Sequence, residues 1–335
     1  MKKLPHTLLT LSAELTQQVI GAPRGASLYE RERDGIRYHY AKVPVGSDRL
    51  DVFIGKVGDP EAEREASELR RAMEIARGRR KLVSILRREG LAAPYKTIGA
   101  TLDSLEYSGL FKAGAVLVGT AAYMMSEPLV GHFLPRPTLM TGDPDPAAAD
   151  LALTAEPPET LEAILKRADP TFEPVIQLDP RRPASRFRTA DGFYVDLVTP
   201  VRRRSDSNPV SVRALGAGAA PLQHIDWLIA DPVTTVALWG AGVAINVPQP
   251  ARFAVHKLIL AQRRRDGMRL KRQKDLAQAD AMIEALLGSD RFALEDALED
   301  ARARGLRGWA QPIDRSLTEL GRSHSDLSRK AVEQA

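Results

Sequence analysis

The chain contains no cysteine in its 335 residues. Disulfide bonds, thiolate metal sites and a cysteine nucleophile are therefore excluded. The same absence suits a reducing compartment, so we expect a cytoplasmic protein. The N-terminus, Met1-Lys2-Lys3 followed by residues 4–11, is a poor match to a signal peptide because Pro5 and His6 interrupt its apolar run.

Several catalytic motifs and a membrane-length apolar run are also missing. The sequence has no Gly-x-x-x-x-Gly-Lys-Ser/Thr loop, no His-x-x-x-His pair and no Gly-x-Ser-x-Gly elbow. P-loop NTPases, zinc hydrolases and serine hydrolases thereby lack their essential parts. The longest apolar stretch, 233–247, is shorter than the roughly 20 residues of a membrane helix. We expect it to be a buried core segment, and we expect no membrane partner.

What the chain does have is an ordinary soluble composition with a basic excess. Hydrophobic residues make up 44% and charged residues 27%, which predicts a packed core. The formal net charge is +5, and arginines cluster at 202–204 and 263–272. Such clusters attract polyphosphate or RNA, although a single cluster is somewhat more often a solvated loop or helix face than a ligand contact.

The order of expected elements predicts three regions. In region 1–90, strands at 36–43 and 50–54 form a hairpin, and a helix runs from Pro60 to Arg88 until Gly90. Region 91–205 alternates helices at 96–107, 120–129 and 158–167 with strands at 113–118, 137–141, 172–178, 185–189 and 193–198. Region 206–335 is mostly helical, with a continuous helical stretch after Pro250 and a surface strand around His224 and Trp227. We therefore expect an α+β (α/β) fold with a mixed sheet, flanking helices and a helical C-terminal region.

Three aspartates have the spacing of a two-metal site. Asp143 and Asp145 are two residues apart after an apolar segment, so on a strand they would point to the same side. Asp196 lies within the otherwise apolar strand 193–198, where a carboxylate needs a cation partner. Magnesium prefers such oxygen ligands, and two magnesium ions would support nucleotidyl transfer.

A phosphate-binding turn is expected at Gly119-Thr120. A buried strand precedes this glycine, and a helix follows the threonine. Glycine permits close approach of a phosphate to the backbone, and amide groups at a helix start attract anions. By itself the pair also fits an ordinary helix start.

Taken in order, Gly119-Thr120, Thr141-x-Asp143-x-Asp145 and Asp196 resemble the signature of the DNA polymerase β-like nucleotidyltransferase superfamily. Over roughly 91–287 the chain is similar to a group of bacterial nucleotidyltransferase-fold proteins whose helical tail carries a Pro-x-Arg-Phe/Tyr-Ala-x-His-Lys-Leu motif. Here that motif spans Pro250 to Leu258. The lysine pattern of the tail is also similar to that of abortive-infection toxins of the superfamily.

The resemblance implies roles for further residues. Lys257 and Lys274 would neutralise the triphosphate, and Asp275 would order Lys274 or the base. Arg252 and His256, from the same tail motif, are additional candidates for nucleotide binding, although a helical histidine is more often an ordinary half-buried residue.

The sequence therefore predicts an enzyme that uses Mg²⁺, or Mn²⁺, to move a nucleoside monophosphate from an NTP to a hydroxyl of RNA, such as tRNA, or of a protein. Asp143, Asp145 and Asp196 are the expected metal ligands and catalytic residues. Pro144 between the first two removes an amide donor and departs from the family pattern. Two alternatives stay open: an inactive nucleotide-binding or sensing module, and a toxin neutralised by an antitoxin partner.

Overall fold

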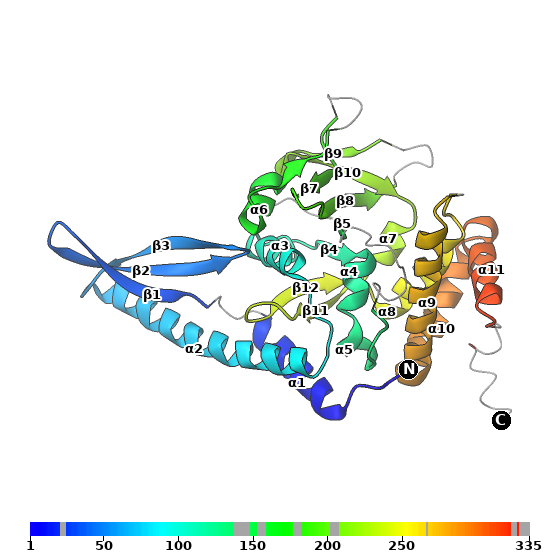
Figure 1. The fold of residues 1–335 in the computed structure, drawn as a ribbon, viewed down its shortest axis with the longest axis horizontal. Helices are drawn as coiled ribbons and strands as arrows, with labels where there is room; N and C mark the ends of the chain where they lie inside the picture. The colour runs from blue at the N-terminus through cyan, green and yellow to red at the C-terminus, as the bar shows by residue number, and fades with distance from the viewer. Residues whose placement is uncertain are drawn as a thin grey trace.

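The computed structural model describes residues 1–20, 25–136, 148–152, 159–176, 182–201, 208–265, 267–322 and 327. Helices lie around a mixed sheet in this part of the chain, which confirms the predicted α+β class. Figure 1 shows a body from which a long arm projects to one side. We use "arm" for the three strands β1–β3 together with the helix α2.

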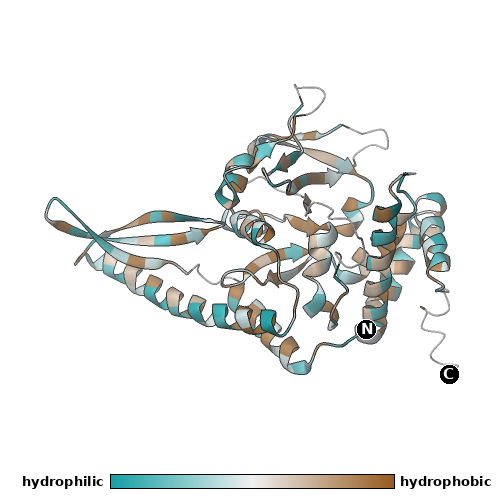
Figure 2. Cartoon of the chain, viewed as in Figure 1, coloured by the Kyte–Doolittle hydropathy of each residue, from teal (hydrophilic) through white to brown (hydrophobic). Residues whose placement is uncertain are grey.

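The arm is a long helix packed along a three-stranded antiparallel sheet. Its elements are β1 (Ser27–Arg33), β2 (Ile36–Val45), β3 (Asp48–Lys56) and α2 (Pro60–Arg88). The predicted hairpin and helix are confirmed, whereas β1 was not predicted. Asp59 caps α2 by accepting hydrogen bonds from the backbone N–H groups of Glu61 and Ala62. Figure 2 shows many hydrophilic residues along α2, as expected for a helix with one face in solvent.

The base of the arm is anchored on the body through the turn between β2 and β3. The backbone N–H of Gly46 in this turn donates to the carboxylate of Asp103 at 2.7 Å. Asp103 lies on α3 (Lys96–Tyr107), whose predicted bounds are confirmed. On the other side of the base, α1 (His6–Val19) packs Leu15 against Val83 and Leu86 of α2.

The body sheet places strands distant in sequence side by side. Its main order is β4-β5-β8-β10-β9, with β6 and β7 extending it beside β8. β5 pairs antiparallel with β4 and parallel with β8, and β10 is also parallel to β8. The strands are β4 (Val116–Val118), β5 (Ala148–Ala152), β6 (Glu173–Pro174), β7 (Arg186–Arg188), β8 (Tyr194–Pro200), β9 (Val210–Val212) and β10 (Ala217–Leu222).

Most predicted elements of the body are present, several with shorter or shifted bounds. The β7–β8 hairpin and the helix α6 (Leu161–Ala168) are confirmed. The helix predicted over 120–129 is split into α4 (Gly119–Met124) and α5 (Glu127–Val130), since Pro128 has no N–H for a continuous helix. The strand predicted at 137–141 lies outside the described residues.

The stretch 233–247 forms a hairpin, not a single segment. It contains β11 (Val233–Ala237) and β12 (Val243–Val247), and much of it is buried as predicted. The surface strand expected around His224 was wrong. Residues Ile225–Leu228 form the short helix α7, in which the side chain of Trp227 is buried.

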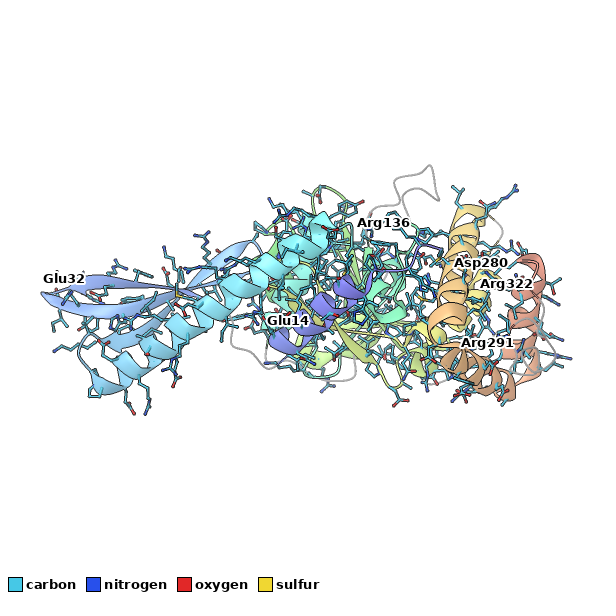
Figure 3. All side chains as sticks on the ribbon, turned by 90° about the horizontal axis from the view of Figure 1, so that it is seen from below. Glu14, Glu32, Arg136, Asp280, Arg291 and Arg322 are labelled. Carbon is cyan, nitrogen blue, oxygen red and sulfur yellow. The ribbon has the colours of Figure 1, made fainter. Side chains whose placement is uncertain are left out.

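Helices cover the remaining side of the body. They are α8 (Pro250–Ala261), α9 (Arg269–Ser289), α10 (Arg291–Ala303), a π-helical turn (Leu306–Ala310) and α11 (Gln311–Glu319). Figure 3 shows Asp280 of α9 beside Arg322, which follows α11. The two side chains form an ion pair at 2.5 Å. Buried residues of these helices and of the sheet form one core cluster. The strands β9 and β10 lie after the predicted boundary at 205/206 but belong to the same sheet. The division at 90/91 and 205/206 stays a prediction.

No helix within the described ranges combines the length and the apolar character that crossing a bilayer requires.

Candidate active site

Three residues on neighbouring strands of the body sheet lie side by side as cross-strand partners. Val118 on β4 pairs with Asp150 on β5, and Asp150 pairs with Asp196 on β8, as judged by their Cα atoms. Because neighbouring strands lie about 4.8 Å apart, the backbones of Val118 and Asp196 are roughly 10 Å apart. The chain leaves β4 directly after Val118, so the Gly119-Thr120 turn lies at the same level as Asp196.

Gly119 and Thr120 occupy the turn that the sequence predicted for phosphate binding. Gly119 has a φ of 71°, a left-handed conformation that favours glycine, and α4 starts there. The hydroxyl of Thr120 accepts a hydrogen bond from Nε2 of Gln278 on α9 at 3.4 Å. Both residues of the turn are partly exposed. The turn is therefore open to a ligand and tied to the C-terminal helices.

Lys257 and Asp275 are brought together by the packing of α8 against α9. Nζ of Lys257 donates to Oδ1 of Asp275 at 2.7 Å, and Nε of Arg264 donates to Oδ2 at 2.8 Å. Burial favours the neutral form of Asp275, but the two cations prevail and hold the pKa of its carboxyl below the usual range. Asp275 is one helical turn before Gln278, so this charge cluster adjoins the Thr120 turn.

His256 is buried beside the same cluster. Burial, and then the charge of Lys257, lower the pKa of its imidazole to about 3, so the ring is neutral near pH 7. Lys274 precedes Asp275 on α9 and is half-buried.

Arg252 has contacts of another kind. Nη1 of its guanidinium donates to the carbonyl oxygens of Trp227 and Ala230, at 2.9 and 3.0 Å. It also forms an ion pair with Asp231 at 3.3 Å. These bonds satisfy carbonyl groups at the end of α7, so the contacts present in the structure give Arg252 a role in fixing that helix.

Asp196 is held by an arginine on the neighbouring strand. Both carboxylate oxygens accept from Arg186, at 2.5 Å from Nε and 2.6 Å from Nη2. The guanidinium also lies over the ring of Tyr194 at 5.0 Å. Such a bidentate pair is strong and directional, so Arg186 sets the orientation of this carboxylate.

The other two predicted metal ligands, Asp143 and Asp145, lie outside the described residues. Within the part of the chain that is described, no three His, Cys, Asp or Glu side chains form a group that could hold a metal. Asp196 fits magnesium in its chemistry, since carboxylate oxygen is the preferred ligand. Sequence reasoning missed Asp150, whose Cα lies between those of Val118 and Asp196. The only signal was a lone acidic residue before Leu151-Ala152.

Comparison with known proteins adds to this geometry. No curated protein sequence and no solved structure matches the chain. A family model described as nucleotidyltransferase matches residues 96–303, which include the Gly119-Thr120 turn, Asp196 and the Lys257–Asp275 pair. Because this match covers more than half of the chain, the protein belongs to that nucleotidyltransferase family.

Proposed function

We propose that the protein transfers a nucleoside monophosphate from an NTP to a hydroxyl group of RNA, such as tRNA, or of a protein side chain. The observation that carries this proposal is the row formed by Val118, Asp150 and Asp196, which sets a glycine turn beside a carboxylate strand. Family membership supports nucleotidyl transfer in general. The identity of the acceptor, RNA or protein, goes beyond family membership and belongs to the proposal.

The roles of the residues follow from their chemistry. The Gly119 turn and the Thr120 hydroxyl bind the β- and γ-phosphates, with positive charge from Lys257 and Lys274 nearby. The acceptor oxygen bonds to the α-phosphorus as the bond to pyrophosphate breaks, and Asp196 helps to remove the hydroxyl proton. Arg252 and His256 lie on α8, the helix that carries Lys257, and Arg252 ties this helix to α7.

Magnesium, or manganese, fits this proposal as a cofactor. Asp196 would hold it together with Asp143 and Asp145, and the metal would neutralise the phosphate charge that develops during transfer. Arg186 donates one hydrogen bond to each oxygen of Asp196 and leaves their other lone pairs, so a cation at this carboxylate would bind close to the guanidinium charge. The positive charge of Arg186 would therefore weaken metal binding at Asp196.

The test is label transfer from each radiolabelled NTP to total RNA or lysate protein in the presence of magnesium. Wild type is compared with Asp196→Asn and with the double variant Asp143→Asn/Asp145→Asn. Asp191→Asn is the matched control, because Asp191 is exposed in the same hairpin and Asn can accept the same bond from Thr189. We expect label to move with wild type and the control only. Full transfer by the other two variants would refute the proposal.

A second candidate is nucleotide binding without transfer, as in a sensing module. The bidentate Arg186–Asp196 pair favours it, because a carboxylate held in this way is already neutralised. It predicts that NTP binds but that no pyrophosphate is released under any condition.

The toxin role is a third proposal, supported by the resemblance of the tail lysines alone. Growth arrest on expression, relieved by Asp196→Asn and by a co-expressed neighbouring gene product, would support a toxin with an antitoxin partner.

A further inference from the structure

The arm has two faces of different character. On β2, His39 and Ala41 are buried, and the Nε2 of His39 lies 2.9 Å from a carboxylate oxygen of Glu63 on α2. Side chains alternate along a strand, so Tyr38, Tyr40 and Lys42 lie on the opposite side. We call that side the outer face. Figure 1 shows the arm extending away from the body, and Figure 3 places Glu32 near its far end.

The strand register defines the outer face. Tyr29 and Phe53 both pair with Tyr40, Arg31 and Lys56 pair with Tyr38, and Asp51 pairs with Lys42. By the same alternation Arg33 and Arg49 belong to it. The aromatic and charged residues of the outer face are therefore Tyr29, Arg31, Arg33, Tyr38, Tyr40, Lys42, Arg49, Asp51, Phe53 and Lys56.

Four aromatic rings form a continuous patch on this face. The centroids of Tyr29 and Tyr40 lie 5.6 Å apart, those of Tyr40 and Phe53 5.4 Å, and those of Tyr38 and Phe53 5.7 Å. Phe53 is 57% exposed. Only 5% of the chain is aromatic, yet three of its seven tyrosines are here. This concentration in a projecting element indicates a binding surface.

The charges around the patch are almost all positive. Arg31, Arg33, Lys42, Arg49 and Lys56 are exposed, and Asp51 is the opposing acidic residue of the face. Lys42 Nζ lies 5.2 Å from the Tyr29 ring, so cation and ring share one surface. A second copy of this chain would bring the same positive charge against it in a symmetric contact, which disfavours self-association through this face.

We propose that the outer face binds single-stranded RNA, with bases stacked on the aromatic rings and phosphates paired with the surrounding cations. Single strands expose flat bases and regularly spaced phosphates, and proteins bind them through aromatic rings within basic surfaces. The choice of RNA over DNA rests on the proposed function, in which RNA is one of the two acceptor classes. The arm then holds acceptor RNA beside the body.

The test measures binding of the full chain to a fluorescent single-stranded RNA of about 12 nucleotides by anisotropy. NTP is omitted and EDTA is present, so no transfer contributes. Duplex RNA and single-stranded DNA of the same sequence are the comparison probes. We expect the single-stranded RNA to bind more tightly than either.

Two sets of variants examine the two parts of the face. Phe53→Thr removes the exposed ring but keeps strand propensity, and we expect a loss of about 5-fold or more in affinity. Arg31→Gln/Lys42→Gln/Lys56→Gln should weaken binding. It should also make the slope of log affinity against log salt concentration shallower by about 2. Arg64→Gln/Arg71→Gln/Arg77→Gln makes the same charge change at exposed positions of α2 and should have a much smaller effect.

Circular dichroism confirms that each variant is folded before its affinity is compared. Equal RNA binding by Phe53→Thr, the outer-face triple variant and wild type would overturn the proposal. So would tighter binding of single-stranded DNA, or a wild-type dimer that Phe53→Thr converts to a monomer. RNA binding without label transfer would support this inference and contradict the proposed function. Label transfer to RNA, together with arm variants that bind RNA as tightly as wild type, would support the proposed function and contradict this inference.

Discussion

The carboxylate of Asp275 accepts from Lys257 at 2.7 Å on one oxygen and from Arg264 at 2.8 Å on the other, with Asp275 fully buried. Asp275→Asn would leave two cations with a neutral partner inside the protein. We expect it to lower the free energy of unfolding by about 3–5 kcal/mol, measured by denaturant titration. Asp280→Asn on the same helix is the control. Asp280 pairs with Arg322 near the surface, so a loss below about 1 kcal/mol is expected there. Equal losses of stability in the two variants would contradict the distinction between a buried and a surface ion pair.

Acid should destabilise the fold through His256. Its pKa is lowered to about 3 in the folded protein, mainly by burial and then by Lys257. Below the unfolded value near 6.5 the unfolded chain takes up a proton that the folded chain does not, so stability falls as pH drops. We expect about 2 kcal/mol less stability at pH 5 than at pH 7 from this residue. His256→Gln should reduce that difference. His224, whose pKa is lowered to about 4 mainly by burial, would add a separate acid destabilisation of the same sign.

Gly119→Ala should damage the phosphate turn. A side chain at a φ of 71° is strained, and we expect a loss of about 1–2 kcal/mol together with a raised KM for NTP. Gly78→Ala is the matched control, since Gly78 lies inside α2 with open space at its Cβ position. That change should stabilise the protein by about 0.5–1 kcal/mol. A KM that is unchanged in Gly119→Ala would separate the turn from NTP binding.

Asp150 is expected to matter for transfer because its backbone lies between the Gly119 turn and Asp196. We predict that Asp150→Asn lowers the kcat of the proposed transfer by about 100-fold or more, as expected for a carboxylate beside the proposed metal ligand Asp196. Asp191→Asn again serves as the control in the same assay. A kcat within about twofold of wild type would remove Asp150 from the site.

Helices were the most predictable part of this fold. The bounds of α2 follow from Asp59 as the cap, Pro60 in the first turn and Gly90 beyond the end, and those of α3 from its apolar spacing. These signals are local. The Lys257–Asp275 pair was predicted as two members of one site, although the sequence did not show that they bind each other.

Elements that depend on distant partners could not be read from the sequence. The strand β5 consists largely of alanine and lacks β-branched residues, and it is a strand because β4 and β8 pair with it on both sides. A surface strand was expected around Trp227, whereas burial of Ile225, Trp227 and Leu228 favours one helical turn. The contact between Thr120 and Gln278 spans 158 residues.

The two ends of the arm differ in what they tolerate. The Gly46 turn is packed on Ser104 and Arg167, so an added residue there would collide with the body. The other turn, Asp34-Gly35, is exposed, and both of its residues have positive φ, as a two-residue hairpin turn requires. Insertion of two residues into each strand next to this turn would keep the strand register and lengthen the arm. The arm can therefore become longer by growth at its tip alone, while the distance between its base and the row of Val118, Asp150 and Asp196 stays fixed.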